Sequence, residues 1–271
     1  TFPADAALTA ENIEANDGTI SNIRINDFDP SKQFYNQTQS LRTYYEFNDV
    51  DVDRYMLNGQ YTQTFLSARE MDSSSLGDVS WLTKHLIYTH GYGVTLSQVD
   101  AITATGQPEM LIYNIPPVSS TEDLKISRPE IYFGESTDNY IITNTHEKEF
   151  DYPNSDGNVY AKYEGKNGVK LSMFRRLVYA IKESNIRILV SSNINSSSKI
   201  LYERNIMDRV NKIAPFLTYD TDPYITISDS GKLYWIIDAY TTTNSYPYSA
   251  STKLNEYSNF NYIRNPIKVV I

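Results

Sequence analysis

An Asn-Gly pair at residues 58 and 59 constrains the fold of this 271-residue chain more than any other feature. Strand-like runs at 45–57 and 60–68 flank the pair. Asn-Gly supplies the two positive-φ residues of a type I′ turn, which is the strongest short-range signal for a β-hairpin. The pattern therefore predicts a hairpin over residues 44–68.

Two more hairpins and four helices are predicted along the chain. A strand, a turn and a strand follow one another at 131–145, and Asp229-Ser230-Gly231 separates two strand-like runs at 224–240. Helical spacing and terminal signals predict amphipathic helices at about 30–41, 79–90, 171–184 and 198–214. Hairpins that surround a few helices indicate an α+β fold with mixed or antiparallel sheets.

The apolar residues of the last two helices fall on one side of each. Leu171, Phe174, Leu177, Val178 and Ile181 share a side of the first, and an amphipathic helix usually turns that side to the core. In the helix at 198–214, the spacing predicts that Ile206, Val210 and Ile213 point inward.

Residues 1–30 have little periodicity and are rich in Asp, Asn and Ala, which predicts a segment that wraps the surface or serves as a linker. We expect residues 31–271 to form a single α+β domain, and the loop-like stretch 151–170 would divide it if it has two lobes. The chain lacks an initial Met and stops after an apolar strand-like run, so we expect a fragment of a longer protein. It contains no run of about 20 apolar residues of the kind a membrane helix needs.

The charge balance limits the partners that this chain can attract. Its 24 basic and 33 acidic residues leave a net charge of −9, which argues against nucleic-acid binding and against direct attraction to anionic lipid headgroups. The absence of cysteine excludes disulfides, thiolate metal sites and a cysteine nucleophile. The 23 tyrosines suit contacts with sugars and peptides, although Tyr is also a good strand former.

The most distinctive tetrapeptide is His90-Gly91-Tyr92-Gly93, at the end of the predicted helix 79–90. A helix C-terminus favours a histidine cation, and Gly91 is placed to form a left-handed helix cap. Flanking glycines also allow a backbone or a ligand to approach closely. His90 and Tyr92 are therefore candidate binding residues, with a plain cap and tight turn as the alternative.

Carboxylates supply the other candidate site residues. Asp49, Asp51 and Asp53 lie on one face of a predicted strand, roughly 6.5–7 Å apart. They are candidate ligands for calcium, and no other cofactor is predicted. Calcium usually takes converging ligands from a loop, which a straight strand does not offer. The alternative is a face whose carboxylates are solvated or paired with Arg. The remaining candidates are Arg128, Glu130, Glu135 and Asp151. The three acids could supply the two carboxyl groups of a glycosidase-type pair, and Arg128 is a basic side chain close to two of them in sequence.

Five longer stretches resemble uncharacterised protein family 0182, and the resemblance runs from about Leu8 to the C-terminus; they are residues 47–55, 85–94, 126–135, 147–153 and 235–242. This family comprises bacterial multi-pass membrane proteins with a large extracytoplasmic domain. The resemblance implies that this chain is the soluble outer domain, on the extracytoplasmic side of the cell membrane. It implies no activity and no catalytic residue.

Three functions are compatible with these observations. The first is a non-catalytic extracytoplasmic binding or scaffold domain that contacts cell-envelope polymer, peptide or a partner protein. The second is a cell-envelope hydrolase or glycan-modifying enzyme that uses His90 with Glu130, Glu135 or Asp151. The third is a divalent-cation-dependent binding module that uses Asp49, Asp51 and Asp53.

Overall fold

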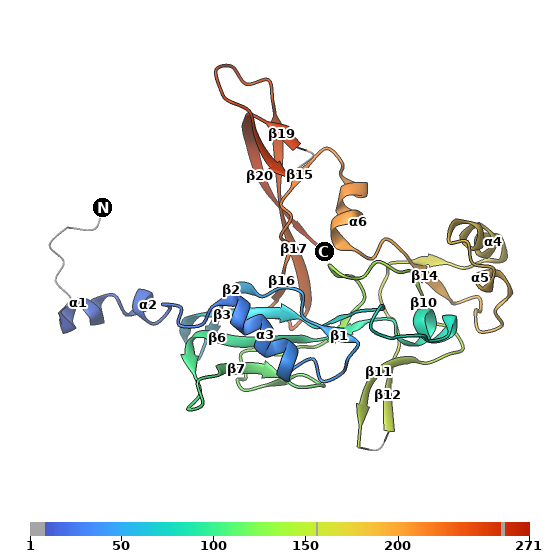
Figure 1. Cartoon of the computed structure of the whole chain (residues 1–271), viewed down its shortest axis with the longest axis horizontal. Coiled ribbons are helices and arrows are strands. Elements are labelled where there is room, and N and C mark those ends of the chain that lie inside the picture. The colour runs from blue at the N-terminus through green and yellow to red at the C-terminus, as the bar shows by residue number, and fades with distance from the viewer. Residues whose placement is uncertain (1–8, 156, 256–257) are drawn as a thin grey trace.

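A computed structural model describes residues 9–155, 157–255 and 258–271 and shows an α+β fold (Figure 1). Its largest sheet has five antiparallel strands in the order β2-β3-β6-β7-β8. These strands are Asp51–Leu57, Gln60–Ala68, Val94–Ile102, Pro108–Tyr113 and Val118–Ser119.

The hairpin predicted at 44–68 is confirmed as β2 and β3. Asn58 and Gly59 have φ values of 51° and 79°, as the type I′ turn requires. The first strand starts later than predicted, because β1 (Tyr45–Glu46) pairs with β4 (Glu70–Met71) instead.

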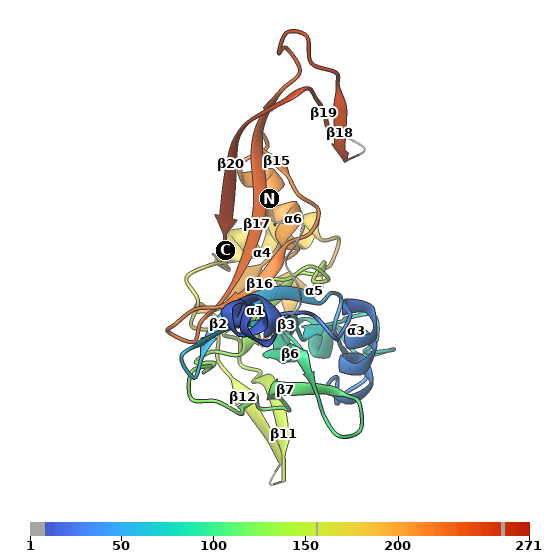
Figure 2. The same ribbon diagram turned by 90° about the vertical axis from the view of Figure 1, so that its left-hand side faces the viewer.

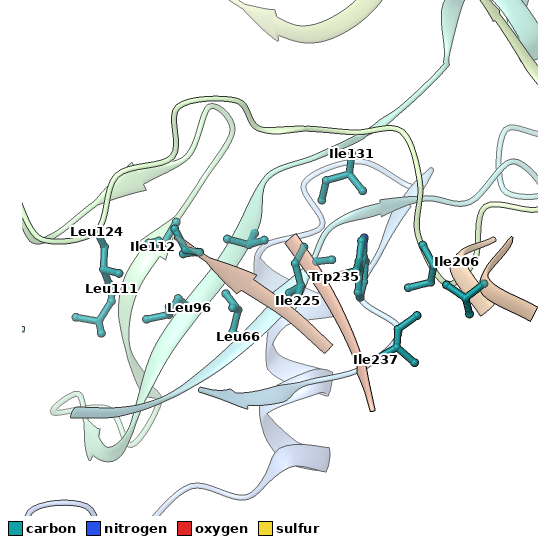
Figure 3. Packing of buried hydrophobic residues seen from close by; sticks show 14 of the residues in the cluster. Leu66, Leu96, Leu111, Ile112, Leu124, Ile131, Ile206, Ile225, Trp235 and Ile237 are labelled. Carbon is teal, nitrogen blue, oxygen red and sulfur yellow. The ribbon is translucent and has the colours of Figure 1, made fainter. Parts of the chain in front are cut away.

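Both faces of the five-stranded sheet are covered. Helix α3 (Phe28–Thr38), capped by the Asp27 side chain, buries Tyr35 against Phe65 on one face. On the other face Leu66 shares a core with residues of the C-terminal sheet and of helix α6 (Ile206–Ile213) (Figure 3). Because successive side chains of a strand point to opposite faces, Phe65 and Leu66 enter different cores.

The predicted hairpin at 224–240 is confirmed as β16 (Tyr224–Ile227) and β17 (Leu233–Thr243). β17 also pairs with β15 (Thr218–Tyr219) and β20 (Tyr262–Val270). Between β17 and β20 lies a small hairpin formed by β18 (Thr252–Asn255) and β19 (Ser258–Phe260). We call residues 240–255 and 258–270 the arm, because Figures 1 and 2 show this part of the chain extending away from the body.

A smaller sheet with the order β10-β14-β13 supports helices α4 (Met173–Lys182) and α5 (Arg187–Val190). Its strands are Ile141–Thr143, Lys199–Leu201 and Val169–Lys170. The predicted hairpin at 131–145 is wrong. β10 pairs with β14, whereas β9 (Glu130–Ile131) pairs with β5 (Gly91–Tyr92), because distant segments supply better partners than the local turn.

Two predicted helices are shorter than expected. The helix at 79–90 is reduced to two α-helical residues, Trp81 and Leu82, followed by a π-helix, Thr83–Ile87. The helix at 198–214 begins only at Ile206, because β14 uses residues 199–201 as a strand.

The apolar side of α4 does not face the core, contrary to expectation. Phe174 and Ile181 are 73% and 71% exposed, and Ile213 of α6 is 70% exposed against its predicted inward position. The opposite side of α4 is the one in contact with the core, through Ala180 and the partly buried Tyr179. Spacing identified an amphipathic helix but not the direction of its apolar side.

The remaining elements are two short N-terminal helices and one hairpin. Helices α1 (Ala10–Ala15) and α2 (Asp17–Ile20) belong to the segment predicted as surface-wrapping or linker, of which residues 1–8 are outside the described part. Strands β11 (Glu149–Asn154) and β12 (Gly157–Ala161) form a hairpin at the predicted lobe boundary, and that boundary stays a prediction. Across the described ranges, we find no helix that is both long and apolar enough to span a membrane.

Candidate functional site

Five of the predicted site residues lie close together, and we call them the His90 cluster. Pairing of β5 with β9 places Tyr92 opposite Glu130. Arg128 donates to Glu130 at 3.2 Å. Asp151, on β11, places its Oδ1 atom 4.0 Å from Nε2 of His90.

His90 is fully enclosed, with 0% of its surface exposed. Burial lowers its pKa to about 4, so the ring is neutral near pH 7, and the predicted histidine cation is wrong. The helix that was expected to favour the cation already ends at Ile87. A neutral ring donates from Nδ1 to the carbonyl oxygen of Gly91 at 3.0 Å, which leaves Nε2 facing Asp151.

Asp151 is an unusual carboxyl group. Burial, the largest cause, and the charge of Glu130 together raise its pKa to about 7. Neither Asp151 Oδ1 nor His90 Nε2 has a hydrogen-bond partner in the part of the chain that the structure describes. His90 and Asp151 therefore form a polar pair inside the fold. Because His90 is fully buried, it cannot contact a substrate in this conformation.

The glycines of the tetrapeptide are explained by backbone packing. A Cβ atom on Gly91 would collide with the carbonyl oxygen of Arg69 and lie 2.9 Å from the Cα atom of Glu70. Gly91 lies in β5 and does not form the predicted left-handed cap. The left-handed residue is Gly93, with φ 72°, where a Cβ atom would lie 2.6 Å from Cγ of Pro117.

Two buried groups that are not among the predicted site residues, Glu149 and Arg204, lie next to the His90 cluster. Glu149 accepts hydrogen bonds from the hydroxyls of Thr89 and Tyr132, each at 2.9 Å. The buried Arg204 guanidinium donates to the backbone oxygens of Thr89 and Tyr132, each at 2.7 Å. Glu149 also lines a cavity of about 620 Å³ with Tyr163, and His90 does not line this cavity.

A second group, the carboxylate cluster, contains Asp49, Asp51, Asp222 and Glu135. One oxygen each of Asp49, Asp51 and Asp222 lies within 4.8 Å of the others. Asp53 does not join them, because its carboxylate accepts a 2.7 Å hydrogen bond from Thr226. Glu135 lies near these carboxylates rather than in the His90 cluster, and their charges act on it.

Burial and mutual repulsion disfavour the ionised form of the carboxyl groups in the carboxylate cluster. Burial, the largest cause, and the charges of Asp49, Asp222 and Asp53 together raise the pKa of Asp51 to about 8. The pKa of Glu135 is also raised to about 8, first by burial and then by Glu70 and the cluster. Burial and a hydrogen bond to Asp49 raise the pKa of Asp222.

This donor set fits a hard divalent cation. Calcium takes oxygen ligands, chiefly carboxylates, and its charge lowers the pKa values of groups that ligate it. The donors also come from two different sheets, because Asp51 begins β2 of the five-stranded sheet and Asp222 precedes β16 of the C-terminal sheet. We call the contact between β2 and β16 the joint. One oxygen of Asp51 already accepts from the backbone N–H of Ile225 at 3.1 Å.

The whole chain, residues 1–271, matches the family model described as Uncharacterised protein family (UPF0182). The chain belongs to this family. UPF0182 proteins of Clostridium botulinum, Clostridium acetobutylicum and Clostridium tetani are 52%, 51% and 49% identical to it over 97%, 100% and 100% of its length. The chain spans only 29%, 29% and 30% of these relatives. No solved structure matches it.

The fold of this UPF0182 chain therefore brings the predicted residues together in two groups rather than one. His90, Tyr92, Arg128, Glu130 and Asp151 meet around β5 and β9, while Glu135 joins the acids at the start of β2. The important missed residue is Asp222, which the sequence presents as part of a turn before a strand. Only its long-range contact with Asp49 reveals its role, and no local pattern encodes that contact.

Proposed function

We propose that this UPF0182 chain is a non-catalytic binding or scaffold domain on the extracytoplasmic side of a bacterial membrane protein. The location is supported by the family resemblance and by a cysteine-free, tyrosine-rich composition. The binding role is supported by one observation, the form of the arm. In this proposal the domain uses the arm to contact cell-envelope polymer, peptide or a partner protein.

The arm contributes little to the core of the chain. β20 is exposed at eight of its nine positions, and within the described residues it pairs with β17 alone. An open strand edge can accept an extended partner segment through backbone hydrogen bonds. Pro266 lacks an N–H donor, so such pairing is limited to the residues on either side of it.

The outer end of the arm also presents tyrosines. Tyr248 is fully exposed, and the rings of Tyr246 and Tyr262 stack at 4.4 Å with Tyr246 half exposed. A flat ring with a hydroxyl suits contacts with sugars and peptides. The arm therefore combines a pairing edge with an aromatic end.

Photo-crosslinking in living cells tests this proposal. A benzoylphenylalanine at Tyr248 or Ile267 of the full-length protein is expected to form covalent adducts with envelope polymer, peptide or protein. The matched control is Tyr61, which is 61% exposed on the five-stranded sheet and should give no adduct. Equal adducts at all three positions, or none at the arm, would contradict a binding role of the arm.

The carboxylate cluster supports a second candidate function, a divalent-cation-dependent binding module. A cation held by Asp49, Asp51 and Asp222 would stabilise the joint between β2 and β16 and hence the position of the arm. If the affinity resembles that of extracellular calcium modules, 5 mM calcium should stabilise the fold by about 2 kcal/mol.

Thermal unfolding with calcium or EDTA distinguishes the proposed ligand set, Asp49, Asp51 and Asp222, from the one predicted from sequence. Asp222→Asn should abolish the calcium-dependent rise in melting temperature. Asp53→Asn should retain it, because Asp53 is bonded to Thr226. The same melting temperature with calcium and EDTA in the unsubstituted chain would refute the cation site.

A further inference from the structure

The helical hairpin α4–α5 turns a broad apolar surface to solvent, and we call it the α4–α5 surface. On α5, Ile186 and Val190 are 63% and 68% exposed. Five residues of α4 are 43–73% exposed and cover an arc of roughly 140° at 100° per residue; they are Met173, Phe174, Leu177, Val178 and Ile181. A surface helix usually buries such a stripe, and an exposed one marks an interaction site.

Contacts on the other side fix the orientation of this hairpin. Ala180 and Ile188 are buried in the core of the smaller sheet. Arg176 of α4 donates to the backbone oxygens of Ile188 and Ser191, at 3.0 and 2.7 Å, and so joins the two helices. The apolar arc could turn inward only if these contacts broke. The hairpin lies at an outer end of the molecule (Figure 1).

The local charge is opposite to that of the whole chain. Residues 166–190 contain six basic residues and one acidic residue, a net charge of +5, whereas all others together contain 18 basic and 32 acidic residues, a net charge of −14. Arg175 and Lys182 follow the apolar arc directly on the helix circumference. Among described residues, no carboxylate forms an ion pair with Arg175 or Arg187.

We propose that the α4–α5 surface docks on an anionic lipid bilayer. Phe174 and Ile181 enter the boundary between headgroups and acyl chains, and Arg175 and Arg187 lie among the headgroup phosphates. Lys182 lies beside them but is already paired with Glu183 and Glu203, at 3.6 and 3.8 Å. A helix with one broad apolar side and adjacent basic residues is the pattern that binds in a membrane interface. The overall charge of −9 does not oppose this locally, because charges beyond about 8–10 Å are screened at physiological salt.

A second copy of the chain is a less suitable partner for this surface. A symmetric dimer places the same patch on both subunits, so two segments of charge +5 would face each other. An anionic bilayer instead supplies the opposite charge and an apolar layer next to it. The proposal depends neither on the cation site nor on the arm.

Vesicle co-sedimentation of the 271-residue chain provides the test. We expect binding to vesicles of phosphatidylcholine and phosphatidylglycerol at 50 mM NaCl, and much weaker binding to phosphatidylcholine alone or at 500 mM NaCl. Phe174→Glu and Ile181→Glu should each weaken binding at least about tenfold, because each removes an apolar side chain that the bilayer would bury. Tyr61→Glu, also exposed but in the five-stranded sheet, should bind like the unsubstituted chain.

A labelling experiment shows which residue enters the bilayer, and the cysteine-free sequence makes it direct. An environment-sensitive fluorophore on Phe174→Cys should brighten and shift to the blue on adding anionic vesicles, whereas the same label on Tyr61→Cys should not. No binding to anionic vesicles at 50 mM NaCl would overturn the proposal. Binding that survives Phe174→Glu, or a dimer that this substitution dissociates, would also overturn it.

Discussion

At the scale of single residues, close backbone packing accounts for the glycines of His90-Gly91-Tyr92-Gly93. Gly91 lets β5 pass against Arg69 and Glu70, and this places His90 in an enclosed position. A side chain at residue 91 would force these segments apart. The tetrapeptide is distinctive because the backbone there has no space, and its glycines need no ligand to explain them.

Gly91→Ala should therefore destabilise the fold by about 2–3 kcal/mol, since the new methyl group meets backbone atoms that cannot move cheaply. Gly18→Ala is the matched control, because nothing lies within 4 Å of its Cβ position in α2. That substitution should be neutral or stabilising by up to about 1 kcal/mol. Urea unfolding of both variants measures the difference, and equal effects would contradict the packing argument.

The raised pKa values of the carboxylate cluster predict a dependence of stability on pH. The pKa of Asp51 rises from 3.8 in the unfolded chain to about 8 in the folded chain. Its contribution to the free energy of unfolding is therefore full below pH 3.8 and is lost as the pH rises through 8. His90 acts oppositely, because its pKa falls from 6.5 to about 4 on folding, and its contribution is lost only below pH 6.5. Between pH 6.5 and 8, a change in the free energy of unfolding therefore reflects the carboxyl groups with raised pKa values and not His90.

In EDTA, the free energy of unfolding should fall as the pH rises from 6.5 to 8. Asp51→Asn and Glu135→Gln should each flatten this slope, because each removes a carboxyl group whose folded pKa is about 8. Calcium should flatten it as well, by favouring the ionised carboxylates. Urea unfolding across this range measures the slope, and a slope as steep in Asp51→Asn as in the unsubstituted chain would refute the assignment.

At the scale of elements, local chemistry determined what could be predicted from sequence. The hairpins at 44–68 and 224–240 were predictable because a short turn joins strands that pair with each other. The strands near 131–145 were not, because β9 and β10 take partners about 40 and 60 residues away along the chain. Asp222 was missed for the same reason, since its neighbour Asp49 is remote in sequence.

The orientation of α4–α5 makes a second element-scale prediction. Ile188→Ala should cost about 2–5 kcal/mol, because Ile188 is fully buried in the smaller core. Phe174→Ala should change stability by less than about 0.5 kcal/mol, because Phe174 is 73% exposed. Denaturant unfolding of the two variants tests which side of the hairpin faces the core. The reverse order would show that the apolar arc of α4 is covered.

At the scale of the whole molecule, the joint between β2 and β16 is one of the contacts that hold the C-terminal sheet, and with it the arm, on the body. Three residues of β2 that share a face bond to three successive residues of β16. Asp51 accepts from the backbone of Ile225, Asp53 accepts from the Thr226 hydroxyl, and Tyr55 accepts from the backbone of Ile227. The carboxylate face of β2, for which solvation was one predicted alternative, is therefore the face that binds the C-terminal sheet.

Weakening this joint should loosen the C-terminal sheet and leave the smaller sheet unchanged. Tyr55→Phe removes the oxygen that accepts the 3.0 Å hydrogen bond from Ile227 N–H, and leaving that buried donor unpaired should cost about 1–2 kcal/mol. Amide hydrogen exchange should accelerate in residues 224–243, whose β17 carries the arm. Exchange in β10 and β14 should stay unchanged, because they belong to a separate core. Equal acceleration in both regions would instead show that the chain opens as a single unit, with no separate joint.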